Sequence, residues 1–192
     1  VVRVLGARRD PAGAEAIQEA LKDPEPRVRV AALESLGSLG DPASAALLLE
    51  AVRSGQGAEK DAAAASLERM RGEEVTKQVL EAVEAEKGAA RAPLLKVLGS
   101  RKAPEALPLL KTAASDGDPA VRRAALEGLA LYDDPSVLPL LVEAAEKGSG
   151  DVQRAAVKGC LRLGDLLARG RRDEAGRIYL KALELAKEAE EL

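Results

Sequence analysis

The side chains that most often carry out catalysis are scarce in this sequence. The chain contains no His, and Cys160 is its single Cys. Ser-His and Cys-His nucleophile pairs are therefore excluded, together with the commonest general base. The usual ligands of zinc and haem iron are missing for the same reason. We expect no metal site and no cofactor.

Carboxylates are the remaining groups that could act as acids or bases. Asp and Glu number 32 among 192 residues, but adjacent pairs such as Glu73-Glu74 lie at predicted helix ends with no pocket-forming pattern around them. The GxxxxGK[ST] and GxGxxG phosphate-binding motifs are absent from the sequence. Cys160 has no partner for a disulfide within the chain, and we interpret it as a buried thiol. The sequence predicts a protein that is not an enzyme.

The composition specifies an unusual core. The chain is 46% hydrophobic but only 1% aromatic, so the core must consist of Ala, Leu and Val, and Ala and Leu are the strongest helix formers. The net charge of −3 is nearly balanced and does not indicate a polyanion as partner. No apolar run approaches the roughly 18 residues of a membrane span. Val1 falls inside an amphipathic pattern, from which we expect a module of a larger multidomain protein.

Helix-breaking residues recur every 31 residues, which indicates an internal repeat. The first series is Pro11, Pro42, Glu73, Pro104 and Pro135, with Glu73 in a slot otherwise filled by Pro. The second series is Pro26, Gly57, Gly88, Pro119 and Gly150. Each unit therefore contains two breaks and two segments between them.

Apolar residues with helical spacing occupy both segments of each unit. The second segments carry one apolar column at Leu5, Leu36, Leu67, Leu98, Leu129 and Cys160. Asp10, Asp41 and Asp134 each precede a Pro, as an N-cap precedes the first helical residue. Pro108 and Pro139 fall in first turns, where a missing donor costs least. Pro93 lies inside a second segment, so we expect that helix to start late or to kink.

These motifs resemble HEAT-like repeats. The stretches 23–33 and 116–126 are similar to the start of that family's second helix, and 134–141 is similar to its first helix. The resemblance extends over about residues 1 to 165, with units as short as those of bilin lyases and many bacterial multidomain proteins. It implies an all-α, right-handed α-solenoid of about five stacked antiparallel helix pairs. No residue that would support lyase chemistry is identified.

The C-terminal segment departs from this period. Gly170, Ala175, Tyr179 and Ala182 have the spacing of the second half of a tetratricopeptide repeat. We therefore divide the chain into a HEAT-like array at 1–150 and, at 151–192, the last repeat helix with a tetratricopeptide-like cap. The alternative is a long capping helix with a charged outer face, since repeat arrays need polar caps.

The resemblance implies a scaffold that binds a protein or peptide. Second helices line the concave side in the HEAT family, so the partner-binding ridge predicted here is Asp61, Lys96, Arg123, Glu127, Arg154, Lys158 and Arg162. Its C-terminal part is the more basic and could attract an acidic partner segment. The alternative is a solvated face with i, i+4 pairs such as Arg123 with Glu127.

The family also implies a structural role for two arginines. Arg29 and Arg122 occupy a position whose basic residue often bonds an Asp of the preceding turn. Asp23 and Asp116 stand at the matching positions. Each such bond would tie a turn to its own helix.

Two other functions are open at this point. One is an architectural spacer that has no ligand, and such a spacer should have a polar inner face. The other is a nucleic-acid-binding domain, for which Arg8-Arg9, Arg101-Lys102 and Arg169 with Arg171-Arg172 would provide the charge. The absence of interleaved aromatic residues and the negative net charge disfavour it. We expect a monomer or a weak oligomer.

Overall fold

The computed structural model describes residues 2, 4, 6 and 13–190, and the side chains of that range up to 186. All regular elements between residues 13 and 190 are helical, as predicted. The predicted cap Asp10-Pro11, the core residue Leu5 and the basic pair Arg8-Arg9 lie outside the described residues.

The helices begin where the 31-residue series places breaks. The second helices of successive units are α3 (Pro26–Leu39), α5 (Gly57–Arg69), α7 (Arg91–Arg101, after a 3-10 turn at Gly88–Ala90), α9 (Pro119–Leu129) and α11 (Gly150–Leu167). The first helices are α2 (Ala14–Glu19, followed by the 3-10 turn Ala20–Lys22), α4 (Pro42–Ser54), α6 (Glu73–Ala85), α8 (Leu107–Ala113, after Pro104–Ala106) and α10 (Leu138–Lys147, after Pro135–Val137). The last helix is α12 (Arg172–Glu190). The all-α fold of paired helices is confirmed.

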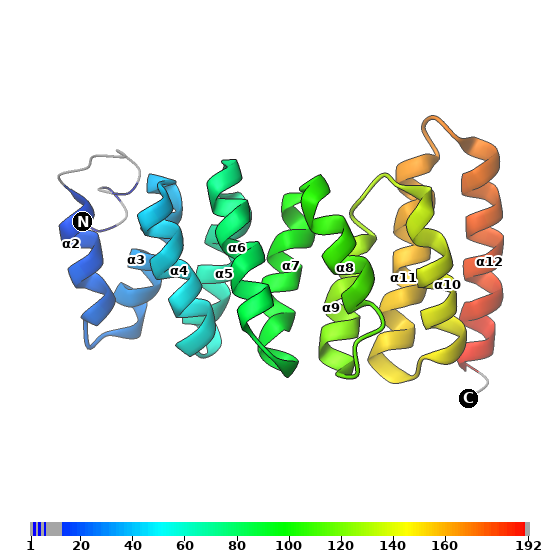
Figure 1. Cartoon of the computed structure of the whole chain (residues 1–192), viewed down its shortest axis with the longest axis horizontal. Helices are drawn as coiled ribbons and strands as arrows, with labels where there is room; N and C mark the ends of the chain where they lie inside the picture. Colours follow the sequence, from blue (N-terminus) through cyan, green and yellow to red (C-terminus); the bar gives the residue numbers. More distant parts are fainter. Residues whose placement is uncertain (1, 3, 5, 7–12, 191–192) are drawn as a thin grey trace. The chain divides into compact units, whose positions relative to one another are not determined.

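The chain forms two compact units, residues 1–97 and 98–192. In the first, α5 packs against both α3 and α4, and α4 also contacts α6. These helices follow one another in Figure 1. Leu36 of α3, Leu48 of α4 and Leu67 of α5 are fully buried. The core of this unit is therefore built from the predicted aliphatic stripes.

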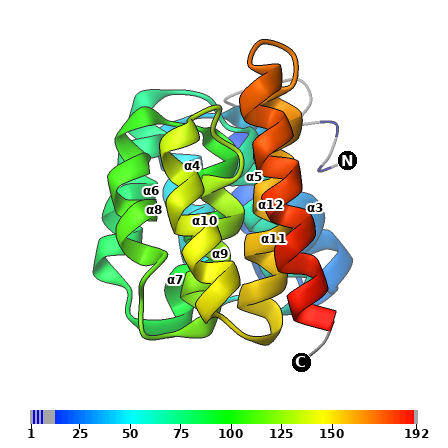
Figure 2. The same cartoon turned by 90° about the vertical axis from the view of Figure 1, so that its right-hand side faces the viewer.

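The second unit has the same pairing and an additional helix. Here α11 packs against α9, α10 and α12, and α8 packs against α9. Figure 2 shows α10, α11 and α12 side by side. Leu129 and Cys160 are completely buried at equivalent repeat positions. Cys160 therefore replaces a core leucine, and burial raises the pKa of its thiol to about 11.

Small residues let consecutive second helices cross closely. A Cβ added to Gly37 would lie 2.6 Å from the Cβ of Ser66 on the next second helix. A Cβ added to Gly99 would overlap the main chain of Gly128. Because packing at such a crossing leaves no space for a methyl group, these positions fix the distance between the helices.

The helix-breaking positions of the two series start their helices in different ways. Asp41 and Asp134 cap as predicted, and their carboxylates accept hydrogen bonds from the amides of Ser44 and Ser136, both at 2.9 Å. Gly57 and Gly150 have φ of +52° and +56°, a left-handed conformation that disfavours other residues. The second series therefore contains both Pro and Gly, and each gives a different entry into the helix.

The remaining prolines also behave as predicted. The segment that contains Pro93 begins as a 3-10 turn at Gly88, and its α-helix starts late, at Arg91. Pro108 and Pro139 each occupy the second position of an α-helix. Their missing amide donors cost little there, because first-turn amides have no partner within the helix.

Candidate binding groove

Most of the predicted ridge converges on one groove between α9 and α11. Five of its residues line this cavity of about 260 Å³, namely Arg123, Glu127, Arg154, Lys158 and Arg162. The other two ridge residues, Asp61 on α5 and Lys96 on α7, are exposed in the first unit and do not line it. We call this cavity, with Ala130, Asp151, Ala155 and Gly159 that complete its lining, the α9–α11 groove.

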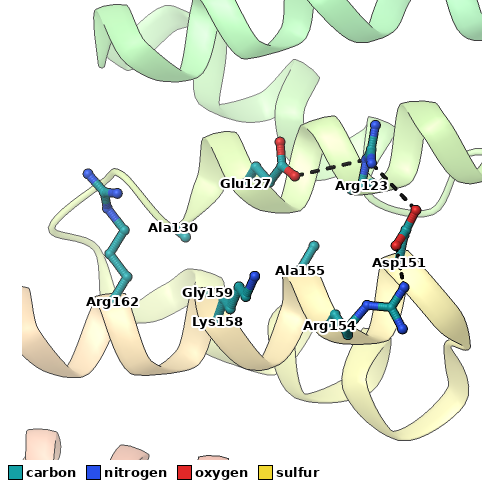
Figure 3. A pocket seen from close by; sticks show the side chains of 9 residues that line it. All are labelled: Arg123, Glu127, Ala130, Asp151, Arg154, Ala155, Lys158, Gly159 and Arg162. Atoms are coloured by element: carbon teal, nitrogen blue, oxygen red, sulfur yellow. Dashed lines mark hydrogen bonds and ion pairs between the residues drawn. The ribbon is translucent and has the colours of Figure 1, made fainter.

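The floor of the groove is apolar and its rim is charged. Ala130 and Ala155 are buried at 2% and 7% exposure, and Gly159 is buried beside them. A Cβ on Gly159 would lie 3.3 Å from the Cβ of Ala130 and 2.8 Å from a methyl carbon of Leu141. Figure 3 shows the charged side chains rising around these small residues from both helices. Gly159 therefore lets α11 pack closely against Ala130 and Leu141, and long charged side chains surround the small residues of the floor.

Asp151 is the one charged lining residue that sequence reasoning missed. Its carboxylate lies 3.6 Å from Nη1 of Arg123 and accepts a hydrogen bond from Nη2 of Arg154. It thereby bridges guanidinium groups from α9 and α11 (Figure 3). The sequence did set Asp151 apart, because the same repeat position holds Ala58, Ala89 and Ala120 in the three preceding repeats.

The electrostatics of the rim follow from these pairs. The hydrogen bond from Arg154 and the nearby charges of Arg154, Arg123 and Lys158 lower the pKa of Asp151. Arg123 is held less well, since its Nε lies 3.9 Å from Glu127 Oε1 and has no hydrogen-bond acceptor among the described residues. No hydrogen bond or ion pair joins Lys158 or Arg162 to the described part of the chain.

The two arginines with an expected structural role donate to main-chain oxygens. Arg29 Nη1 donates to the carbonyl oxygens of Asp23 at 2.8 Å and Pro24 at 3.1 Å. Arg122 Nη1 donates in the same way to Asp116 at 2.7 Å and Gly117 at 3.0 Å. The carboxylates of Asp23 and Asp116 instead accept hydrogen bonds from main-chain amides two residues on.

Arg29 makes a further contact that the sequence did not indicate. Its Nη2 lies 2.6 Å from Oε1 of Glu59, on the second helix of the next repeat. This hydrogen bond is the largest effect that raises the pKa of Arg29 and lowers the pKa of Glu59. The guanidinium therefore joins its own turn to the neighbouring repeat.

The C-terminal hairpin contains a close contact at the positions of the tetratricopeptide-like spacing. A Cβ on Gly164 of α11 would lie 2.8 Å from the ring of Tyr179 on α12. The Tyr179 hydroxyl donates to Asp165 at 2.6 Å, and this bond raises the pKa of Tyr179. Ala175 and Ala182 are buried against α11. The hairpin is thus closed by one aromatic ring over one glycine.

The described part of the chain has neither a metal-binding cluster nor a helix that could span a membrane. It contains no cluster of His, Cys, Asp or Glu able to hold a metal ion. Nor does any described helix combine the length and apolar character that a membrane span requires.

Comparison with known proteins identifies a repeat family. The sequence profile described as HEAT repeats matches residues 1–68 and 73–162. A search of curated proteins found no match. Among solved structures, the chain is similar to a protein in the complex of CpcE and CpcF of phycocyanin lyase from Nostoc sp. PCC7120, with 20% identity and a TM-score of 0.49 over 100% of this chain and 87% of that one. Human deoxyhypusine hydroxylase in complex with glycerol is similar at 16% identity and a TM-score of 0.40, over 97% and 78% of the two chains.

Proposed function

We propose that this chain, which belongs to the HEAT repeat family, is a protein-binding scaffold whose contact surface is the α9–α11 groove. One observation carries the proposal. Five residues chosen from their repeat position and the resemblance to HEAT repeats line a single groove with a buried apolar floor. Binding surfaces commonly combine an apolar centre with a polar rim.

The same floor distinguishes the scaffold from an architectural spacer. A spacer needs no apolar centre on its inner face, and its exposed charges would lie over polar residues. Here Ala130 and Ala155 form a floor under the cationic rim. In this proposal residues 1–150 are the array, and 151–192 supply its last repeat helix and a cap. In this proposal the groove binds a partner and does not catalyse, and its lining contains no Ser, Thr, Cys or His.

A charge-reversal variant tests the proposal. Peptides would be selected from a random phage library on the immobilised chain, and the enriched peptide measured by fluorescence anisotropy. Arg123→Glu with Arg154→Glu and Lys158→Glu should weaken binding about 10-fold or more, as expected when several charged contacts become repulsive. Equal binding by this variant would contradict the choice of surface.

A matched control separates local from overall charge. Lys22→Glu with Lys77→Glu and Lys87→Glu makes the same charge change at exposed residues of the first unit. This variant should bind the selected peptide with little change. Circular dichroism melting of both variants would show that the helices remain folded. If no peptide is enriched by the wild-type chain, the spacer becomes the better interpretation.

A further inference from the structure

The cations of the α9–α11 groove fall into two classes. Arg123 and Arg154 already share the carboxylate of Asp151. Lys158 and Arg162 follow on successive turns of α11, both exposed and without a hydrogen bond or ion pair to the described residues. Residues four apart lie on one face of a helix. The groove therefore has a neutralised end and a cationic end.

The neutralised end is also loosely held. Arg123 lies 3.6 Å from Asp151 and 3.9 Å from Glu127, which is beyond ordinary hydrogen-bond length. Its Nε has no acceptor in the described structure. A guanidinium gains most from a bidentate carboxylate. A ligand carboxylate could therefore satisfy Arg123 better than the two protein carboxylates do.

We infer, on the basis of the proposed function, that the groove binds an acidic segment of a partner protein and that Asp151 competes with it. Carboxylates of the segment bind Lys158 and Arg162. A further carboxylate takes the position of Asp151 between Arg123 and Arg154. Asp151 thus lowers the affinity of the groove for acidic segments and favours those with closely spaced Asp or Glu residues.

The lining favours an acidic peptide over a nucleic acid. Duplex DNA carries one charge per roughly 1.7 Å of its axis, and that continuous charge would face the fixed carboxylates of Glu127 and Asp151. No aromatic side chain lines the groove for base stacking. A peptide can instead place its carboxylates opposite the cations and its small apolar side chains on the alanine floor.

The binding probe is a fluorescein-labelled peptide of alternating Glu and Ala, measured by anisotropy against the same peptide with Gln in place of Glu. Lys158→Gln with Arg162→Gln should weaken binding of the Glu peptide about 10-fold, since both unpaired cations are lost. Arg171→Gln with Arg172→Gln, at the α11–α12 turn, removes the same charge and should have little effect. Equal loss in both variants would overturn the site.

The decisive variant is Asp151→Asn, because removing a competitor should improve binding. We expect about 2- to 5-fold tighter binding, the range of one exposed ion pair. Asp133→Asn changes the net charge equally at an exposed residue outside the groove and should change nothing. Tightening by both variants would indicate overall charge, and tightening by neither would remove the role of Asp151.

These outcomes are distinct from failure of the proposed function. If the Glu peptide does not bind but a phage-selected peptide binds and depends on Arg123, Arg154 and Lys158, the scaffold proposal stands and the acidic ligand is wrong. A duplex DNA of matched charge that binds more tightly than the peptide, with the same dependence on Lys158 and Arg162, would overturn the peptide inference in favour of a nucleic acid.

Discussion

The α3–α5 pair and the α9–α11 pair occupy equivalent repeat positions but carry different charge. The four groove cations Arg123, Arg154, Lys158 and Arg162 correspond to Val30, Asp61, Ala65 and Arg69 of the first unit. The retained cation, Arg69, donates to Ser66 at 3.2 Å. Similarly packed helices can therefore carry either set of side chains. The basic charge of the groove comes from its own residues and not from the repeat fold.

The ion pair that joins consecutive second helices also involves different repeat positions in the two units. In the first unit it joins Arg29 to Glu59, both about a quarter exposed at 26% and 29%. In the second unit Arg122 keeps its bonds to the turn, but the interhelix pair joins the next residue, Arg123, to the exposed Asp151, one residue before the position that corresponds to Glu59. The ion pair between consecutive second helices is therefore not fixed by the repeat and can form at different positions.

Core truncation should produce the largest effect and test whether the two units are equally built. Leu67→Ala and Leu129→Ala remove equivalent, fully buried side chains. Each should cost about 2–5 kcal/mol, from lost burial and the cavity that remains. Urea unfolding monitored by circular dichroism measures the change. A negligible loss at either position would contradict the repeat alignment.

The helix crossings should respond next most strongly, and differently in the two units. In Gly99→Ala the new methyl group meets the main chain of Gly128, so the helices must separate at a cost of about 1–3 kcal/mol. In Gly37→Ala it meets the side chain of Ser66. Adding Ser66→Gly should restore that stability, because Ala130 already faces Gly159 in this way. Failure of the second substitution to rescue the first would show that Ser66 does not limit the crossing.

The N-caps should show smaller, pH-dependent effects. Burial opposes the charge on Asp41, but hydrogen bonds from the Ser44 hydroxyl and amide outweigh it and lower the pKa. The hydroxyl and amide of Ser136 lower the pKa of Asp134. Asp41→Ala and Asp134→Ala should each cost about 0.5–2 kcal/mol at neutral pH. We expect the larger loss at Asp41, whose partner Ser44 is buried at 2% exposure.

The sign of the pH dependence follows from the lowered pKa values. A carboxylate with a lower pKa in the folded state stabilises the protein above its unfolded value, near 3.8, and loses that contribution as the pH falls through the folded value. The difference between wild type and either variant should therefore shrink below about pH 4. A difference in the free energy of unfolding that stays constant down to pH 2 would show that the carboxylates are not the origin.

Local features explain why the fold could be predicted and the groove only in part. Pro42, Glu73 and Pro119 begin helices as expected. The signals that start a helix depend only on residues nearby in the sequence. Asp151 could be recognised as an Ala slot filled by a charge. Arg123 was predicted as a ridge residue, but its contact with Asp151 could not be, because that contact depends on how closely Gly159 lets α11 approach α9. The predicted ridge also grouped Asp61 and Lys96 with residues of the second unit. Equivalent repeat positions show which residues correspond, but they do not show which residues lie close together.

Transplanting the cations should have the smallest effect and sharpen the comparison most. The substitutions Val30→Arg, Asp61→Arg and Ala65→Lys, added to the charge-reversal variant, place the missing cations beside Arg69. The Glu peptide should then bind about 2- to 10-fold more tightly than to the charge-reversal variant alone, and the gain should fall with salt. Glu81→Lys with Glu84→Lys on α6 is the control with equal net charge. A gain confined to the graft would mean that cations on consecutive second helices suffice. No gain, with the helices folded, would mean that the alanine and glycine floor of the α9–α11 groove is also required, because Ser66 stands where that groove has Gly159.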